Sequence, residues 1–469
     1  MGSIEAARAA VDASVLSGFG VLLFLVTAMP LALAEAAGSA RLWRALRRLA
    51  AASLALSWPA SLLWLWLKAG AMAGEPSLGA VWLVLRTTWF GQLIAAGVAA
   101  SVLALVLAWA GRGRLAAGVA GLGVAVLALH GHGLAMEGGF SLLVAVSVLH
   151  VLAAGAWLGG LVPLLMVVRR APAEVAARVA RAFSPLGKWC VGVMALTAGW
   201  QFWVMVGGLP GLVGTSYGWM VAAKAWLFVL LTVLAVLNRY RLALALRGAR
   251  ARTARLAFTA SLAGQIAAGL AVVAVAATLS GLTPAMHEQP DWPFPLRPSL
   301  VALDEPETRD EVVPALAELG FGLALVGIGV WRRRTVAVAA GVVVVGMAVP
   351  HLDLLFVPAT PTSYFVAPET EAAMVARGET LFAAHCAACH GPARDSGAVM
   401  DLAAAHLLDH ADGELFWWVA HGIDRPRGGQ VMPGFAAVLD DADIWAVIAF
   451  VRARNPAWAG ERGGSGHRH

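Results

Sequence analysis

Ten apolar segments recur over the first 358 residues, and they constrain the fold more than any other feature of this chain. About 20 apolar residues let a helix cross the hydrocarbon core of a bilayer, where helices satisfy their own backbone hydrogen bonds. The sequence therefore predicts an all-α, polytopic transmembrane bundle of about ten spans. The predicted spans are residues 14–34, 50–67, 88–110, 115–135, 141–168, 187–207, 219–238, 256–281, 315–331 and 335–357.

The composition excludes the common classes of soluble protein. The 469 residues are 60% hydrophobic and only 13% charged, whereas a soluble globular chain carries roughly 25% charged residues. Three cysteines are too few for a disulfide-stapled scaffold. Because the first span has only Arg8 as a basic leader, we expect no cleavable signal peptide.

Positive charge alternates between the loops and predicts the orientation of the bundle. The loops after the first, third, fifth, seventh and ninth spans hold 20 of the 26 Lys and Arg residues before residue 359. Basic loops stay in the cytoplasm, so both termini are predicted to face the periplasm of a bacterial inner membrane. The net charge of +6 follows from this loop bias, and we expect no nucleic-acid partner.

The histidines are distributed unevenly with respect to the predicted orientation. All 12 lie on the outer side or in the outer half of the bundle, seven of them after residue 358. Acidic, histidine-containing loops are often external, which is one explanation. The other is that the histidines share a chemistry that faces outward.

The tail contains the run Cys386-Ala-Ala-Cys389-His390, the attachment pattern for c-type haem. Two thiols three positions apart can each bond one vinyl group, while the adjacent imidazole reaches the iron. A redox C-x-x-C motif is the competing interpretation, and the predicted all-helical surroundings disfavour it. The sequence therefore predicts one covalent haem c, with His390 as an axial ligand of the iron.

Met432 is the predicted second axial ligand, because Pro433 and Gly434 place it in a non-helical loop. Met400 is a rival. Residues 371–385 and 440–454 are predicted to form an entry and an exit helix, with Asp440 or Asp441 as the N-cap of the second. In outline, the tail is a class I cytochrome c, with 416–418 on a middle helix that walls the haem.

Several side chains of the bundle are candidate copper ligands. Imidazole and thioether groups suit copper, with thioethers favouring Cu(I). The candidates are His130, His132, Met136 and His150, brought together by the short connection between the fourth and fifth spans. An intramembrane histidine such as His150 can instead bond a neighbouring carbonyl.

Three further residues are second-tier candidates. Lys224 lies within the seventh span, where it either takes part in the chemistry or anchors the helix at the interface. His287 and His351 extend the predicted outer cluster as ligands or entry-path residues.

The segment from His150 through Trp157 to Gly159-Gly160-Leu161 resembles the H-x₆-W-x-G-G-L segment of the copper resistance protein D (CopD) family. The resemblance covers roughly residues 115–300, and the whole chain resembles CopD-like proteins fused to a C-terminal cytochrome c. It implies an inner-membrane protein that takes periplasmic copper inward. The expected domains are 1–114 (N-terminal helices), 115–300 (CopD-like core), 301–358 (two further helices) and 359–469 (periplasmic cytochrome).

The sequence thus predicts a copper transport or copper-handling protein with a tethered electron carrier, rather than a catalyst. Its expected partners are the bilayer, copper ion or a periplasmic copper donor, and a periplasmic or membrane redox protein. One alternative is a quinol- or respiratory-chain-linked subunit with haem b between His132 and His150. Another is a factor that delivers copper to a terminal oxidase.

Overall fold

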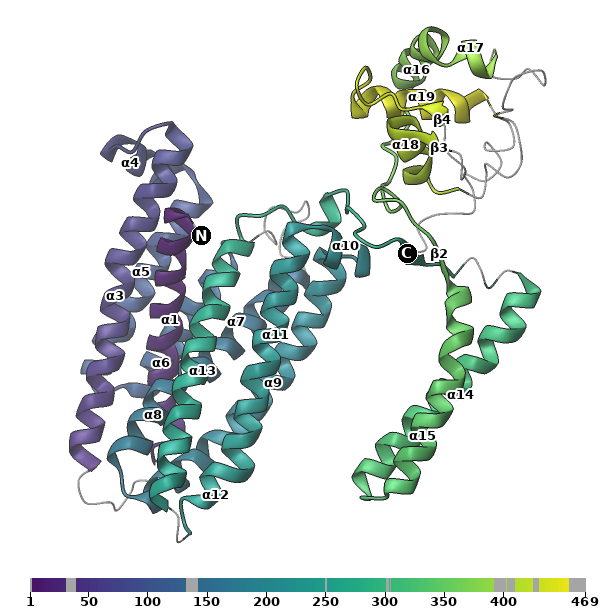
Figure 1. Ribbon diagram of the computed structural model, residues 1–469. Coiled ribbons are helices and arrows are strands. Elements are labelled where there is room, and N and C mark those ends of the chain that lie inside the picture. Colours follow the sequence, from purple (N-terminus) through teal and green to yellow (C-terminus); the bar gives the residue numbers. More distant parts are fainter. Residues whose placement is uncertain are drawn as a thin grey trace. The chain divides into compact units, whose positions relative to one another are not determined.

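The computed structural model describes residues 2–30, 39–131, 142–248, 251–300, 303, 305–391, 402, 410–424 and 430–454. The chain forms two units, residues 1–212 with 216–288, and residues 213–215 with 289–469 (Figure 1). The first unit is a helical bundle, and the second contains two apolar helices and a small C-terminal domain. Across the described residues the fold is helical apart from two short strand pairs, so the predicted all-α fold is confirmed.

The bundle is built from helices that differ widely in length. Up to residue 288 they are α1 (Ser3–Thr27), α3 (Ser39–Ala73), α4 (Leu78–Thr87), α5 (Trp89–Trp109), α6 (Gly113–Ala128), α7 (Leu142–Leu158), α8 (Leu161–Arg170), α9 (Ala173–Met205), α10 (Leu209–Gly214), α11 (Ser216–Leu237), the π-helix η2 (Asn238–Leu242), α12 (Ala243–Ala245), α13 (Ala251–Leu279) and the 3-10 helix η3 (Ala285–His287).

Within the described part of the chain, eight helices are long and apolar enough to cross a membrane. Each of the ten predicted segments contains a helix, but two of these helices are not among the eight. The fourth predicted segment overlaps α6, which has only 16 residues, and the sixth overlaps the second half of α9, whose first half contains Glu174, Arg178 and Arg181. The membrane-helix fold is therefore confirmed, while the number of ten spans stays a prediction. The first helix begins at Ser3 rather than at residue 14.

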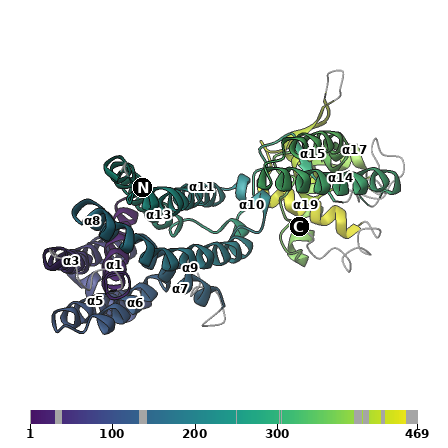
Figure 2. The same cartoon turned by 90° about the horizontal axis from the view of Figure 1, so that it is seen from below.

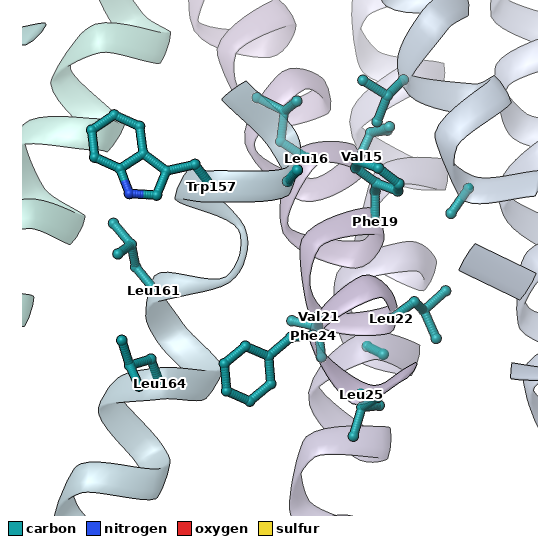
Figure 3. Close-up of a cluster of buried hydrophobic side chains, with 14 of the residues drawn as sticks. Val15, Leu16, Phe19, Val21, Leu22, Phe24, Leu25, Trp157, Leu161 and Leu164 are labelled. Atoms are coloured by element: carbon teal, nitrogen blue, oxygen red, sulfur yellow. The ribbon is translucent and has the colours of Figure 1, made fainter. Parts of the chain in front are cut away.

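Helix α1 is the centre of the bundle. It packs against α3, α6, α7 and α13, and the view along the bundle shows it among α3, α6 and α8 (Figure 2). Its side chains Leu16, Phe19 and Phe24 are buried close to Trp157 and to Leu161 of α8 (Figure 3). The core of this unit is thus a set of apolar faces that converge on one helix.

Glycines allow α1 to approach the break between α7 and α8. A Cβ atom on Gly20 would overlap the backbone of Gly159, and a Cβ on Gly159 would overlap the carbonyl oxygen of Leu16. Small residues at such crossings let two helix backbones come into contact. The Gly159-Gly160 pair of the CopD-like motif therefore has a packing role, and the neighbouring Trp157 is 2% exposed.

The second unit begins with a helical hairpin and a short sheet. Helix α14 (Pro306–Trp331) packs against α15 (Thr335–Ala348), and Arg333 has a positive φ of 54° in the tight connection. The 3-10 helix η5 (Val349–Leu355) follows α15. Strand β1 (Leu296–Pro298) pairs antiparallel with β2 (Phe356–Pro358), so the segments before and after the hairpin are joined.

The described part of the C-terminal domain contains four helices and one strand pair. Its elements are α16 (Ala372–His385), α17 (Ala387–His390), α18 (Asp412–His421), β3 (Gly422–Asp424), β4 (Gln430–Pro433) and α19 (Asp441–Arg454). The predicted entry and exit helices are confirmed as α16 and α19. The Asp440 carboxylate accepts a hydrogen bond from the Asp443 amide at 2.8 Å, which makes Asp440 the N-cap of α19.

Candidate functional site

The haem-attachment run forms a single helical turn. The amides of Cys389 and His390 donate to the Cys386 carbonyl at 3.1 and 3.0 Å. Positions three and four residues apart lie on one face of a helix, so the turn presents both thiols and the imidazole together. Cys386 is buried and Cys389 is exposed.

An apolar cavity lies beside this turn. Cys386, His390 and Met432 line it, and α18 and α19 supply most of the remaining wall. The other lining residues are Phe382, Leu402, His410, Leu415, Trp418, Val419, Ile423, Val447, Ile448 and Val451. A thiol, an imidazole and a thioether around an apolar space form a donor set that fits covalently bound haem c. Cys389, next to His390 on the same turn, supplies the second thiol of the run.

Met432 reaches the cavity through the β3–β4 hairpin. It pairs in register with Ile423, and both side chains line the cavity. The structure thus places Met432 and His390 on the same cavity although 41 residues separate them along the chain, while Met400 lies outside the described residues. Of the three aromatic residues 416–418 predicted to wall the haem, Trp418 is the one that lines this cavity. Phe416 packs on Trp445 in the domain core, and Trp417 stacks on His421.

The cavity histidine His410 belongs to a buried polar group. Its Nδ1 lies 3.0 Å from Oε2 of Glu414, and its ring meets Trp418 edge to face. The other oxygen of Glu414 accepts a hydrogen bond from Arg297 of strand β1 at 3.1 Å. A buried carboxylate needs such partners, and here they connect the cavity wall to the segment that precedes α14.

The two thiols of the run have different surroundings. Burial, together with the neighbouring Cys389 sulfur, raises the pKa of the Cys386 thiol to about 11. Desolvation disfavours the thiolate, which is the charged form. Before any thioether bond forms, Cys386 is therefore a protonated thiol inside an apolar pocket.

A second cavity, of about 210 Å³, lies inside the bundle and contains His150. Its wall combines side chains of six helices, among them polar groups that are far apart in sequence. The polar and sulfur-containing residues on it are Arg8, Asp12, Ser147, His150, Met194, Gln201, Met205, Tyr217, Lys224 and Ser280. Arg8 and Asp12 lie 3.7 Å apart one turn along α1. We call this space the His150 cavity.

The hydrogen bonds of His150 assign its tautomer. Its Nδ1 lies 2.8 Å from the Thr197 hydroxyl, and that hydroxyl donates to the Val193 carbonyl at 2.7 Å. Because the Thr197 proton is committed to the carbonyl, its oxygen accepts from His150 Nδ1–H. The Nε2 atom then carries the free lone pair, which is the arrangement of a histidine that binds a metal.

The structure does not place His130 on the His150 cavity. Its ring packs against Trp64 and Phe90, at centroid distances of 5.0 and 5.6 Å. Its Nδ1 bonds the Val126 carbonyl at 3.1 Å, and its buried Nε2 has no partner among the described residues. His130 therefore also has a free ring nitrogen, but in an aromatic environment.

The remaining predicted ligands are dispersed or lie outside the description. His132 and Met136 are outside the described residues. His287 is exposed in η3, and His351 is exposed with Glu311 at 3.8 Å. Lys224 is among the residues that line the His150 cavity. In the part of the chain that the structure describes, no three His, Cys, Asp or Glu side chains form a metal-binding group.

Comparisons with known families match three regions. Residues 3–142 match the model described as Copper resistance protein D-like, N-terminal domain, and residues 177–279 match Copper resistance protein D. Residues 373–451 match Cytochrome C oxidase, cbb3-type, subunit III. This chain is a CopD-family membrane protein with a C-terminal cytochrome c domain. The cytochrome domain of this CopD-family protein implies haem c.

Similar curated proteins agree with this division. The chain is 30% identical over 153 residues to copper resistance protein D of Pseudomonas syringae pv. tomato, covering 30% of this chain and 49% of that protein. It is 36% identical over 96 residues to cytochrome c6 of Picosynechococcus sp., 19% of this chain and 80% of that protein. Dihydro-heme d1 dehydrogenase of Pseudomonas aeruginosa is 35% identical over 89 residues, 18% of this chain and 17% of that protein. The chain thus spans about half the length of the copper-resistance relative. No solved structure matches it significantly.

Sequence reasoning missed most of the His150 cavity of this CopD-family protein. Arg8 was interpreted only as a basic leader, and Asp12, Gln201, Met194 and Met205 were not singled out. The usable signal was present, because charged or amide side chains inside apolar segments are costly and usually functional. Which of these side chains share one cavity depends on how the helices pack.

Proposed function

We propose that this CopD-family protein handles copper at the bacterial inner membrane, taking it from the periplasm, with the cytochrome c domain exchanging single electrons with a periplasmic or membrane redox partner. In this proposal both termini and the cytochrome domain lie on the periplasmic side of the membrane. We further propose that the first three domains of the chain end at residues 114, 300 and 358. The chain spans only part of its relatives, so transport and partners belong to the proposal.

The observation that carries the proposal is the state of His150. Thr197 holds its Nδ1, so Nε2 is the ring atom that would bind a metal, and the thioethers of Met194 and Met205 line the same cavity. Imidazole and thioether donors together favour Cu(I). The sequence-predicted residues His130, His132 and Met136 are proposed as earlier contacts for copper on its way to His150.

The cytochrome domain has its own assigned residues. Cys386 and Cys389 would hold haem c by thioether bonds, and His390 and Met432 would be the axial ligands of its iron. The bound group supplies one-electron transfer. The chain itself contributes an apolar wall that excludes water and, through Met432, a soft ligand that favours a high reduction potential.

Copper content of purified variants tests the bundle site. We expect His150→Ala to lose Cu(I) binding, and Thr197→Val to weaken it about 10- to 100-fold, because a supporting hydrogen bond orients a metal-bound imidazole. Met194→Leu should also weaken binding. Met166→Leu is the matched control, because Met166 lies in α8 and is not among the residues lining the His150 cavity. Unchanged copper stoichiometry in His150→Ala would contradict the proposal.

A pyridine haemochrome spectrum separates the copper function from the electron-transfer alternative. Haem c alone agrees with copper handling. Haem c together with haem b would favour a quinol-linked subunit and would remove His150 from the copper path.

A further inference from the structure

A third cavity, of about 670 Å³, lies at the end of the bundle near α12, and neither the copper function nor the haem uses it. Residues of α7, α8, α9, α11, η2, α12 and α13 line it. Figure 1 shows α12 at the lower end of the bundle. Its volume is within the range of about 300–1,000 Å³ that is usual for small-molecule sites. We call it the Arg239 cavity.

One side of the Arg239 cavity is positively charged. Arg181, Lys188 and Arg239 line it, and none of its described lining residues is acidic. Arg239 donates from Nη1 to the Ser184 hydroxyl, whereas its buried Nε has no partner among the described residues. A buried guanidinium N–H without an acceptor is costly, so a ligand with an anionic or strongly accepting group would suit this position.

A second polar group lies next to Arg239. The Asn238 side-chain amide donates to Gln265 Oε1 at 3.3 Å, and Gln265 donates to the Leu231 carbonyl at 3.2 Å. Both side chains are buried, at 7% and 1% exposed, yet Asn238 Oδ1 has no donor among the described residues. A ligand that completes this site would therefore offer a hydrogen-bond donor to Asn238 Oδ1 beside the acceptor that suits Arg239.

A distortion of α11 brings Asn238 and Arg239 to the cavity. The helix continues into η2, where the Ala243 amide bonds the Asn238 carbonyl five residues back. Single π-turns of this kind are rare in proteins, and those that do occur often lie at functional sites. Here the wider turn places two consecutive polar residues on the wall of one cavity.

The rest of the wall is apolar. Trp157, Leu161, Leu164, Phe258 and Leu262 line it, and Phe258 and Leu262 are each 1% exposed. A free phosphate ion would leave this surface uncovered. A ligand with an anionic head, a hydroxyl donor and a hydrocarbon chain would satisfy the cations, Asn238 Oδ1 and the apolar wall together.

We propose that the Arg239 cavity binds an anionic phospholipid with a hydroxyl-bearing headgroup. The phosphodiester is held by Arg239 with Arg181 and Lys188 at the mouth, a headgroup hydroxyl donates to Asn238 Oδ1, and an acyl chain lies along the apolar wall. In the predicted orientation this end of the bundle meets the cytoplasmic leaflet, where anionic lipids attract Lys and Arg. The site is separate from His150 and does not depend on copper.

Native mass spectrometry of the full haem-containing chain tests the site. After delipidation, the protein is titrated with phosphatidylglycerol, with phosphatidylcholine, which is zwitterionic and has no headgroup donor, and with inorganic phosphate. We expect one tightly retained phosphatidylglycerol per chain and at least about tenfold weaker binding of phosphatidylcholine, since its quaternary ammonium faces three cationic side chains and it offers Asn238 no donor. Equal retention of the two lipids would overturn the proposal. Equal thermal stabilisation by inorganic phosphate and phosphatidylglycerol would overturn it too, by assigning a free-phosphate site.

Matched variants locate the lipid. Arg239→Gln should weaken the binding of phosphatidylglycerol about tenfold. The double variant Arg181→Gln/Lys188→Gln, with both changes at exposed positions, should also weaken this binding while leaving the fold intact. Arg241→Gln is the control, because Arg241 belongs to η2 but is not on the cavity wall. Size-exclusion profile and haem absorbance report folding. Retained affinity in Arg181→Gln/Lys188→Gln and in a folded Arg239→Gln would contradict the assignment.

Discussion

Arg297 in strand β1 and Glu414 in helix α18 form an ion pair with 3.1 Å between Nη2 and Oε1, although 117 positions separate them in the chain. Both side chains are largely buried, at 19% and 11% exposed. The pair therefore links the segment before the α14–α15 hairpin to the wall of the haem cavity. It also holds the carboxylate that contacts His410.

Breaking this pair should destabilise the cytochrome domain. We expect Arg297→Gln to lower its stability by on the order of 2 kcal/mol, between the values for exposed and for fully buried ion pairs. Thermal unfolding followed by haem absorbance measures the change. Arg454→Gln is the control, because its pair with Glu379 is about half exposed. Equal losses of stability in the two variants would show that the buried Arg297–Glu414 pair contributes no more than the exposed Arg454–Glu379 pair.

Replacement of Met432 should change the haem without unfolding the domain. Thioether ligation favours a high potential, so Met432→Ala is expected to lower the haem midpoint potential by on the order of 0.1 V. A redox titration of the purified protein measures it. Met374→Leu serves as the control, because Met374 packs in the domain core and is not among the residues lining the cavity. An unchanged potential in Met432→Ala would remove this residue as the axial ligand.

In haem-free protein the two thiols of the attachment run should react at different rates. The raised pKa of Cys386, about 11, leaves little thiolate at neutral pH, and the side chain is also buried. Exposed Cys389 should therefore be alkylated first, with Cys386 following as the pH rises toward 11. Peptide mass spectrometry after timed alkylation resolves the two sites. Faster reaction of Cys386 at neutral pH would contradict this difference in environment.

The same raised pKa has a consequence for the stability of haem-free protein. The unfolded chain releases the Cys386 proton near pH 9, whereas the folded chain retains it to about pH 11. The unfolded state thus binds fewer protons in this interval, so the stabilising contribution, complete below pH 9, is lost as the pH rises from 9 to 11. Denaturant unfolding at pH 8, 9.5 and 11 tests the sign, with Cys386→Ala as the variant that should lack this component.

Packing of α1 should depend on Gly159. A side chain there would overlap the Leu16 carbonyl, so we expect Gly159→Ala to destabilise the bundle by roughly 1–3 kcal/mol, as overpacking does. Gly192→Ala is the control, because it lies inside α9 with open space around it, and added helix propensity should make it neutral or slightly stabilising. Thermal unfolding in detergent compares the two. Tolerance of Gly159→Ala would show that α1 can shift away from α7.

Lys224 provides a test of charge in the His150 cavity. Its ammonium repels a cation bound at His150, so Lys224→Met should strengthen Cu(I) binding about fivefold. Competition with a chromogenic Cu(I) chelator measures the affinity. Weaker binding in a folded Lys224→Met protein would instead make Lys224 part of the path that copper needs.

The sequence by itself determined the features that depend on neighbouring residues. Apolar length indicated the eight membrane-length helices found among the described residues, and the spacing of Cys386, Cys389 and His390 predicted one helical turn. The non-helical backbone at Met432 was predictable from Pro433 and Gly434, but the structure places the residue in strand β4 rather than in a loop. These patterns are local, and backbone geometry translates them directly into structure.

Only the tertiary structure decided which distant side chains share a cavity. Arg8, Gln201 and Lys224 join His150, whereas His130, 20 residues away from it, packs against Trp64 and Phe90 instead. Hydropathy leaves open the rotation of each helix about its axis and the choice of its neighbours. Those are fixed by contacts such as that of Gly20 with Gly159, where two backbones meet because both lack a side chain.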